Sequence, residues 1–230
     1  MKVIGIIGGM SWESTALYYR ILNETVRKQL GGLHSARVVL YSVDFHLIEE
    51  LQAAGDWEKA GDHLALAARS LELAGAEMLI LATNTMHKVA SQMMAGIRIP
   101  LLHIADATAE RIKTAGFKKA GLLATRFTME QDFYRGRLEK QHGITVITPN
   151  EDDRQFVHDV IYHELCLGLI RSESRLHFRD IMSRLVEEGA EAIILGCTEI
   201  TLLVNCEDAS VPLFDTTLIH AEDAVRQALV

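Results

Sequence analysis

The chain has 230 residues, of which 49% are hydrophobic and 23% are charged, as in an ordinary globular protein of one large or two small domains. Its net charge of −8 disfavours nucleic acid and anionic membrane surfaces as partners, because both require a basic face. No stretch reaches the ~18 apolar residues of a membrane span. Three cysteines without CxxC spacing disfavour a disulfide framework or a cysteine-rich zinc site and favour the reducing cytoplasm.

The first half of the chain alternates predicted strands with predicted helices. Short apolar segments without strict alternation are typical of strands that are covered on both faces, and they occur at 2–7, 37–43, 77–82 and 99–103. Amphipathic patterns predict helices at 13–30 and 57–74. The turn GGMSWEST after the first strand lacks the lysine of a P-loop and the GxGxxG spacing, so it is a weak signal for a nucleotide.

The second half repeats this alternation. Strands are predicted at 119–124, 144–148, 191–195 and 211–214, and helices at 129–141, 173–188 and 216–228. The segment TMEQ at 128–131 has the spacing of a helix capping box. The acidic clusters at 49–51 and 151–154 are expected to be solvated surface.

Three pairs of segments match between the halves in the same order. VIGIIGGMS resembles KAGLLATRFTM, GAEMLILATNTM resembles GAEAIILGCTEI, and IPLLHIAD resembles VPLFDTT. The offsets are nearly constant, at 116, 114 and 112 residues for Gly5 and Gly121, Thr83 and Cys197, and Pro100 and Pro212. A duplicated unit of alternating strands and helices predicts an α/β fold of two similar doubly wound domains with mainly parallel sheets, related by pseudo-twofold symmetry.

Thr83 and Cys197 occupy the same place in the two halves, directly after a strand and before a helix. Ligands bind at the carboxyl ends of the strands in such sheets, so each half presents a hydroxyl or a thiol where a ligand is expected. The plainer alternatives are a core cysteine and a threonine that only caps a helix. If the halves face each other, the two groups would flank one ligand, as 1,1-proton transfer in racemisation requires.

The two predicted helix starts suit this chemistry. A thiolate at Cys197 would be stabilised by the helix dipole and by free backbone N–H groups. The N–H groups of Asn84, Thr85 and Thr198 would hold a carboxylate, because a helix start is an anion site.

The motifs GGMSWEST, TNTMHK and GCTEI, in this order, resemble the aspartate/glutamate racemase family over essentially the whole chain. The resemblance implies a cofactor-independent cytoplasmic enzyme that acts on a small-molecule amino acid substrate and forms a homodimer. It also implies two domains, 1–98 with 215–230 and 99–214, with the active site in the cleft between them. The family's catalytic pair is two cysteines. The second falls on Cys197, whereas the first falls on Thr83, which is a departure.

This departure has an energetic consequence. The pKa of a thiol is about 8.5, whereas that of an alcohol is close to the ~15.7 of water, so forming the alkoxide costs on the order of 10 kcal/mol more. We therefore expect Cys197, as a thiolate, to remove the α-proton, and Thr83 or a water that it holds to return one from the other face. Turnover is then expected to be slow, and one enantiomer to be processed much faster.

The resemblance also implies which residues bind the substrate. Six positions are expected in the pocket: Met10, Gln52, Asn84, Thr85, Thr125 and Thr198. Gln52 falls where aspartate-specific members of the family carry a basic residue. Another is expected within HELCLG, where Leu165, Cys166 and Leu167 supply none. Both changes leave the preferred amino acid open.

Several other polar residues have plain structural explanations. His87 follows Thr83 by one helical turn and is interpreted as a structural or surface histidine, and Glu199 as the partner of a helix dipole, although each also suits a role at the site. Cys166 and Cys206 are expected to be inert. No metal motif is formed by the remaining residues of ligand type: His103, Asp106, Asp215 and His220.

The sequence therefore predicts an isomerase, a cofactor-independent racemase of a small acidic or polar amino acid such as aspartate or glutamate. Two alternatives stay open. A decarboxylase or isomerase of the same superfamily that uses a single thiol is one, because Cys197 has no matching thiol at position 83. The other is an amino-acid-binding protein that has kept the pocket and lost the chemistry.

Overall fold

The computed structural model describes all 230 residues, which form two compact units, Met1–Ile104 with His220–Val230 and Ala105–Ile219. Each unit contains one four-stranded sheet in which neighbouring strands are parallel. The strand orders are β2-β1-β3-β4 and β6-β5-β7-β8, which is the same order when each unit is followed along the chain. This repetition confirms the predicted α/β class with two similar units.

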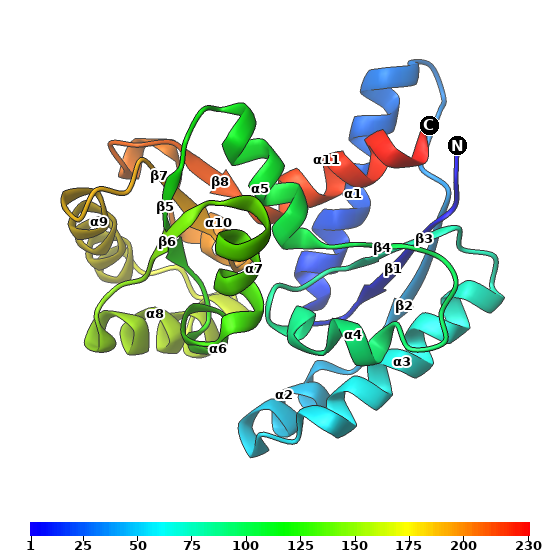
Figure 1. Cartoon of the computed structure of the whole chain (residues 1–230), viewed down its shortest axis with the longest axis horizontal. Helices are drawn as coiled ribbons and strands as arrows, with labels where there is room; N and C mark the ends of the chain where they lie inside the picture. The colour runs from blue at the N-terminus through cyan, green and yellow to red at the C-terminus, as the bar shows by residue number, and fades with distance from the viewer. The chain divides into compact units, whose positions relative to one another are not determined.

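The first unit carries strands β1 to β4 and the helices between them (Figure 1). The strands are β1 (Ile4–Gly8), β2 (Val38–Ser42), β3 (Met78–Leu81) and β4 (Leu101–Leu102). The helices are α1 (Trp12–Leu30), α2 (Phe45–Ala54), α3 (Trp57–Leu73), the 3₁₀ helix η1 (Thr85–Val89) and α4 (Ala90–Met93). The last helix, α11 (Thr216–Ala228), begins in the second unit and ends in the first.

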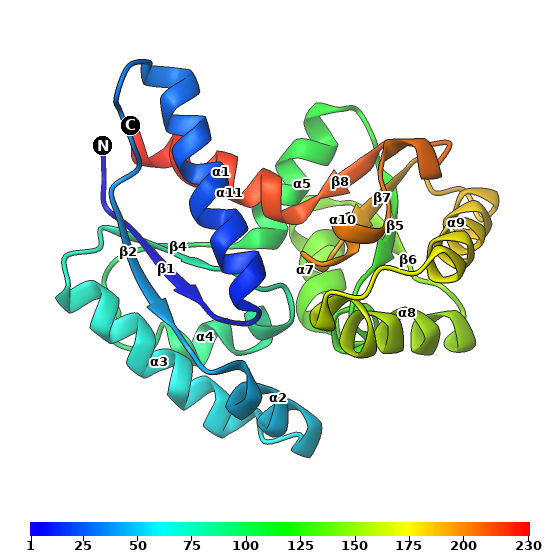
Figure 2. The same ribbon diagram turned by 180° about the vertical axis from the view of Figure 1, so that it is seen from behind.

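The second unit carries strands β5 to β8 (Figure 2). The strands are β5 (Lys119–Leu123), β6 (Thr145–Ile147), β7 (Ala192–Leu195) and β8 (Leu213–Asp215). The helices are α5 (Ile104–Thr114), α6 (Arg126–Glu130), α7 (Asp132–His142), α8 (Glu151–His163), η2 (Leu165–Leu167), α9 (Ser172–Glu187), α10 (Ile200–Leu203) and η3 (Cys206–Asp208). None of the helices in the chain combines the length and the apolar character that crossing a bilayer requires.

All eight predicted strands are present, and the helices predicted at 13–30, 57–74, 173–188 and 216–228 are confirmed to within a residue or so at their ends. The prediction of a helix capping box at 128–131 was wrong, because α6 begins at Arg126 and Thr128 lies inside this helix. The prediction that the acidic cluster at 151–154 is solvated surface was wrong in part, because Asp153 is buried. The cluster forms the first turn of α8, where acidic side chains interact favourably with the helix dipole.

The sheet of the first unit lies between two layers of helices. On one face, α1 and α11 pack against Ile4, Ile6 and Ile80. On the other face, α3 and the segment from η1 to α4 pack against Ile7, Leu79 and Leu81. Strands β1 and β3 are therefore buried on both faces, which explains their continuous runs of apolar residues.

Matched glycines allow close packing over the first strand of each sheet. A Cβ added at Gly5 in β1 would lie 2.7 Å from Leu79 Cδ2, and one at Gly121 in β5 would lie 2.7 Å from Ile193 Cδ1. Gly121 also faces Leu185 of α9, whose Cδ1 would be 3.0 Å away. Real side chains essentially never approach so closely. The repeat in the sequence therefore corresponds to a repeat in packing.

Candidate active site

In the first unit, the predicted site residues lie at the carboxyl end of the sheet. Met10 follows β1 and Thr83 follows β3, and these two strands are neighbours. The strand order reverses between them, since β1 leads to β2 on one side and β3 lies on the other. This is the position at which parallel α/β sheets bind their ligands.

The turn after β1 is held by the first turn of α1. Gly9 has a φ of 93°, and a Cβ there would lie 2.2 Å from the carbonyl oxygen of Val43, so only glycine fits. The Gly9 N–H donates to Thr15 Oγ1 at 2.8 Å, and this hydroxyl donates to the Ser11 carbonyl at 2.8 Å. Met10 is thereby fixed between β1 and α1, with its side chain buried.

Thr83 is half-buried, whereas Asn84 and Thr85 beside it are buried. The N-cap of η1 is Asn84, so the Thr83 hydroxyl does not cap this helix. The plainer explanation of Thr83, that it serves only as a helix cap, does not fit this geometry.

Gln52 extends from α2 to the same loop. Its side chain is 4% exposed, and its amide nitrogen donates to the sulfur of Met86 in η1 at 3.0 Å. Met86 and Met10 belong to the same buried cluster. Gln52 therefore places a neutral amide beside the end of β3. An amide can form hydrogen bonds there, but it cannot supply a positive charge to pair with an anionic ligand.

His87 was interpreted from sequence as a structural or surface histidine, and it is buried, with 3% exposure. Its Nδ1 lies 2.7 Å from the Thr83 carbonyl oxygen, and its Nε2 accepts the N–H of Ile104 at 3.3 Å. Since Nε2 acts as an acceptor, we assign the proton to Nδ1, which donates to Thr83. The ring of His103 lies beside it, with 4.3 Å between ring centroids.

In the second unit, Cys197 follows β7 and Thr125 follows β5, which are again neighbouring strands. Gly196 separates β7 from Cys197, and its N–H donates to the Leu123 carbonyl at 2.7 Å. A Cβ at Gly196 would lie 2.9 Å from Leu122 Cδ1. The close approach explains why a glycine precedes the thiol. Thr125 is buried, and its hydroxyl lies 3.2 Å from that of Thr128.

Cys197 is bonded to a carboxylate two residues further along the chain. Its sulfur donates to Glu199 Oε2 at 3.0 Å, and the Thr198 hydroxyl donates to the same oxygen at 2.6 Å. Glu199 is 5% exposed. Burial raises the pKa of the Cys197 thiol well above its usual value, and the negative charge of Glu199 raises it further.

The expectation of a Cys197 thiolate stabilised by a helix start was therefore wrong for this state of the site. The helix that follows, α10, has four residues, and its dipole does not offset burial and the carboxylate. The resting group is a thiol that donates to Glu199. The sequence favours Glu199 as the partner of a helix dipole, whereas the structure shows it bonded to the Cys197 thiol. The spacing of two residues between Cys197 and Glu199 in GCTEI is the feature of the sequence that indicates this contact.

Cys166 lies close enough to Cys197 for its charge to contribute to the raised pKa of that thiol. It belongs to η2 and is partly exposed, whereas Cys206 in η3 is exposed. Leu165, Cys166 and Leu167 of η2 thus supply a thiol and no basic side chain.

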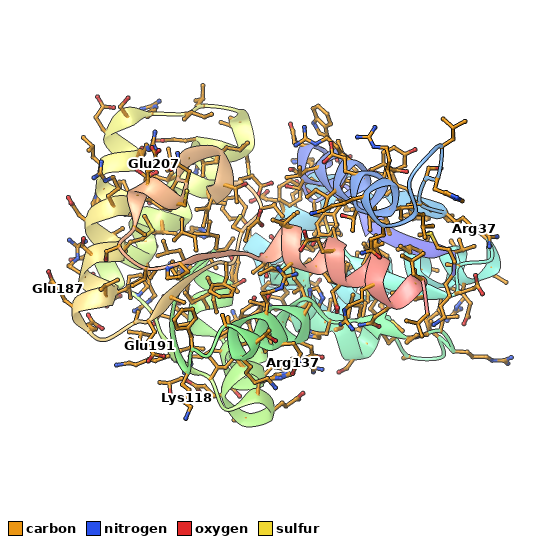
Figure 3. The ribbon with its side chains drawn as sticks, turned by 90° about the horizontal axis from the view of Figure 1, so that it is seen from above. Arg37, Lys118, Arg137, Glu187, Glu191 and Glu207 are labelled. Carbon is orange, nitrogen blue, oxygen red and sulfur yellow. The ribbon has the colours of Figure 1, made fainter.

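The residues of metal-ligand type are engaged in other contacts. Arg137 (Figure 3) donates to both oxygens of Asp106 at 2.6 and 2.7 Å. Although burial opposes it, these bonds and one from His142 lower the pKa of Asp106. Asp215 accepts the N–H of Thr217 at the start of α11. His220 lies between the Tyr18 hydroxyl and the Leu102 carbonyl, each at 2.9 Å.

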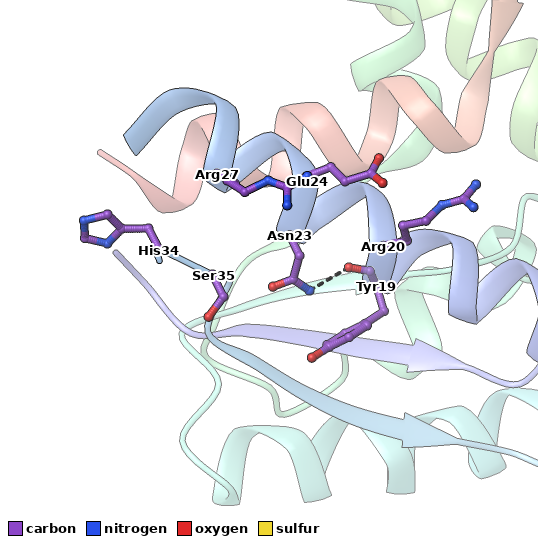
Figure 4. Close-up of a pocket in the computed structure, with 7 residues that line it drawn as sticks. All are labelled: Tyr19, Arg20, Asn23, Glu24, Arg27, His34 and Ser35. Carbon is purple, nitrogen blue, oxygen red and sulfur yellow. Dashed lines mark hydrogen bonds between the residues drawn. The ribbon is translucent and has the colours of Figure 1, made fainter. Parts of the chain in front are cut away.

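A separate open groove lies along α1, away from these residues (Figure 4). It has a volume of about 410 Å³. None of the predicted site residues lines it; the lining residues are Tyr19, Arg20, Asn23, Glu24, Arg27, His34 and Ser35. The groove is therefore not part of the candidate active site.

Two units of one topology, each with reactive or hydrogen-bonding side chains after its two central strands, define a duplicated α/β protein with a strand-end site. The family model described as Asp/Glu/Hydantoin racemase matches residues 7–224. The chain belongs to this family, and it is an isomerase of the racemase class.

Similar proteins cover the whole chain. The broad specificity amino-acid racemase RacX of Bacillus subtilis (strain 168) is 24% identical over 233 residues, which cover 99% of this chain and 98% of RacX. A solved structure of a candidate Asp/Glu racemase from Yersinia pestis is 60% identical with a TM-score of 0.94, and both chains are covered completely. An aspartate racemase homologue from Pyrococcus horikoshii OT3 is 35% identical with a TM-score of 0.86, again with complete coverage of both chains.

Proposed function

We propose that the chain catalyses cofactor-independent racemisation of a small acidic or polar amino acid by 1,1-proton transfer between Cys197 and Thr83. The observation that carries this proposal is the 3.0 Å hydrogen bond from Cys197 Sγ to Glu199 Oε2, because a thiol beside a buried carboxylate has a base in place for its proton. Thr83 supplies a hydroxyl at the corresponding position of the repeat. Relatives named as amino-acid and aspartate racemases support the substrate class.

The proton path that we propose starts at the sulfur. Glu199 accepts the Sγ proton, and the thiolate then removes the α-hydrogen of the substrate as a proton. The electron pair left on the α-carbon is delocalised into the substrate carboxylate. Thr83, or a water that its hydroxyl holds, delivers a proton to the opposite face. Because a threonine alkoxide costs on the order of 10 kcal/mol more than a thiolate, Thr83 relays a proton that solvent supplies, and Glu199 releases the proton that it accepted to solvent. One proton thus enters for each one that leaves, and neither alkoxide nor hydroxide remains.

Thermodynamics limits how the two directions can differ. The enantiomers have equal free energies in solution, so kcat/KM must be equal in both directions, and a higher kcat for one enantiomer brings a proportionally higher KM. The difference between the Cys197 thiol and the Thr83 hydroxyl is instead expected in the exchange of the α-hydrogen with solvent. The enantiomer whose α-hydrogen faces Cys197 exchanges with retention, because the sulfur can return a solvent-derived proton to the same face. The other enantiomer exchanges mainly with inversion.

Hydrogen-bond donors in both loops suit a zwitterionic amino acid. The proposed binding groups are Met10, Gln52, Asn84, Thr85, Thr125 and Thr198, of which all but Met10 have polar side chains and all are buried. The Gln52 amide is neutral, so it favours a side chain that forms hydrogen bonds without requiring a counter-charge. Candidate substrates therefore include amino acids with amide or short hydroxylated side chains, in addition to aspartate and glutamate.

The direct test is a panel of single-enantiomer amino acids incubated with the protein in D₂O. We expect loss of the α-hydrogen NMR signal and inversion for aspartate, glutamate or a polar relative, and neither when Cys197→Ala replaces the wild type. The same panel without α-deuteration or inversion for any amino acid would contradict the proposal.

One observation favours a second candidate. A single thiol at Cys197, with a threonine at position 83, also suits a decarboxylase that protonates one face of a planar intermediate. This candidate predicts CO₂ release from a disubstituted malonate and no α-exchange on amino acids. A binding protein without catalysis predicts a ligand-dependent rise in Tm without exchange.

A further inference from the structure

The loop that carries Thr83 has an unusual backbone arrangement. The first hydrogen bond of η1 runs from the His87 N–H to the Asn84 carbonyl at 3.1 Å. It therefore begins one residue beyond Thr83. The Thr83 carbonyl instead accepts from the His87 side chain, through Nδ1 at 2.7 Å. An imidazole thus supplies the donor that a regular α-helix would supply from its backbone.

In the second unit, the carbonyl of the equivalent residue, Cys197, accepts its hydrogen bond from a backbone N–H. There the Ile200 N–H donates to the Cys197 carbonyl at 3.2 Å. Thr201 stands at the position that corresponds to His87, with the offset of 114 residues that relates Thr83 to Cys197. Its hydroxyl bonds to the Thr198 carbonyl at 2.9 Å. The carbonyl of the reactive residue is therefore held in both units, but a side chain holds it only at Thr83.

Both polar backbone groups of Thr83 are fixed. Its N–H donates to the Leu81 carbonyl at 2.8 Å, and its carbonyl accepts from His87. The side chain of threonine is branched at Cβ and has few χ1 choices on a given backbone. The direction of the Thr83 hydroxyl consequently depends on the orientation of this peptide.

His87 is itself held firmly. It is 3% exposed, its Nε2 accepts from Ile104 N–H after β4 at 3.3 Å, and its ring contacts that of His103. It therefore ties the loop after β3 to the loop after β4, and any shift of its ring moves the Thr83 peptide.

We propose that His87 is a positioning residue for the proton transfer at Thr83. It acts as a neutral Nδ1–H imidazole that orients the Thr83 peptide and, through it, the hydroxyl. The inference rests on the proposed racemase function. Because a misplacement of about 1 Å can cost about 100-fold in rate, the effect is expected on the step that Thr83 performs and not on the step that Cys197 performs.

Two substitutions separate the two hydrogen bonds of the ring. The amide of asparagine reaches the place of Nδ1, so His87→Asn keeps a donor to the Thr83 carbonyl. The amide of glutamine reaches the place of Nε2, so His87→Gln keeps a partner for Ile104 and loses the bond to Thr83. A matched control is His142→Gln, which removes a largely buried histidine that bonds to Asp106 in the second unit and not to Thr83.

The measurement compares inversion with α-deuteration under retention, starting from the enantiomer that exchanges at Cys197. In His87→Gln we expect inversion to fall by about 10-fold or more while deuteration under retention stays within about 2-fold and KM changes little. His87→Asn should keep inversion within about 3-fold of wild type. In His142→Gln the ratio of the two rates should stay at the wild-type value.

A proportional loss of inversion and deuteration in His87→Gln, or equal behaviour of His87→Asn and His87→Gln, would show a general structural role and overturn the proposal. If neither variant folds, ¹⁵N NMR of the histidine-labelled wild type decides: a neutral Nδ1–H tautomer at His87 supports it, and an Nε2–H tautomer or an imidazolium overturns it. Absence of exchange and inversion in wild type would instead contradict the racemase function, on which this role depends.

Discussion

At the scale of single residues, the proton transfer that we propose centres on Cys197 and the carboxylate bonded to it. The thiol is protonated and donates to Glu199, and burial and the Glu199 charge both raise its pKa. In the mechanism that we propose, Cys197 becomes a base only when Glu199 takes its proton. Its proposed role therefore depends on Glu199.

Replacing Glu199 by glutamine tests this dependence. Glu199→Gln removes the negative charge that raises the pKa of Cys197, so the thiol should become reactive toward iodoacetamide at lower pH than in wild type. Its pKa should stay above the usual thiol value, because burial remains the larger cause. Racemisation should nevertheless fall by about 100-fold, since the base for the thiol proton is lost.

Peptide mapping by mass spectrometry would follow Cys197 separately from Cys166 and Cys206 in this experiment. Glu199→Asp is the matched control, because it keeps the charge and should leave the pH of half-maximal reactivity nearer to that of wild type. An unchanged or higher pH of reactivity in Glu199→Gln would show that the carboxylate does not control the thiol.

At the scale of elements, helix α11 attaches to the first unit through a buried histidine. His220 is fully buried and lies between the Tyr18 hydroxyl of α1 and the Leu102 carbonyl of β4. Both bonds suit a neutral ring that donates from Nε2 and accepts at Nδ1. Burial lowers the pKa of His220 to about 4, from an ordinary value of 6.5.

This pKa makes the stability of the fold depend on pH. Between pH 6.5 and about 4 the unfolded chain binds a proton at His220 that the folded chain does not, so protonation favours unfolding and stability falls as the pH falls. The full difference is about 3 kcal/mol, reached near pH 4 and absent above pH 7. Urea unfolding of wild type and His220→Gln between pH 4 and 8 measures it.

His220→Gln should be less stable than wild type at pH 8, and its stability should fall less between pH 7 and pH 4, by about 3 kcal/mol. The comparison isolates His220 because the other titrating groups are shared. Parallel stability curves for the two proteins would show that His220 is not held neutral by its surroundings.

The strands could be predicted from the sequence for a physical reason. Strands such as β1 and β3 are buried on both faces, so each is a continuous apolar run that is easy to recognise. The protonation of Cys197 was not accessible, because it depends on burial and on Glu199, whose contact is set by the fold. Asp153 was missed for the same reason, since the bond to Arg184 at 2.7 Å comes from a distant helix.

At the scale of the whole molecule, the duplication explains why the two units carry unlike groups at equivalent positions. The two units share strand order, matched close-packed glycines and a reactive side chain after the third strand of each sheet. A repeat of the fold places the groups, and divergence between the repeats makes one a thiol and the other a hydroxyl. We propose that this difference divides the two proton transfers unequally between the units.

The sequence predicted this division only in outline. The matched GAE segments identified Thr83 and Cys197 as equivalent positions, because strand ends in a repeat coincide in topology. The sequence favours a structural or surface histidine at position 87, because the bond from His87 to the Thr83 carbonyl depends on the 3₁₀ geometry of η1. Nothing in the spacing of Thr83 and His87 distinguishes that geometry from a regular helix.

The most direct test of the account follows α-deuteration and inversion together, by NMR and chiral chromatography in D₂O, for wild type, Thr83→Val and Cys197→Ala. Thr83→Val should keep deuteration under retention for one enantiomer while inversion falls by about 100-fold or more, and Cys197→Ala should lose both. If Thr83→Val inverts its substrate as fast as wild type, or if Cys197→Ala still exchanges the α-hydrogen, the two residues do not share the reaction and the account is wrong.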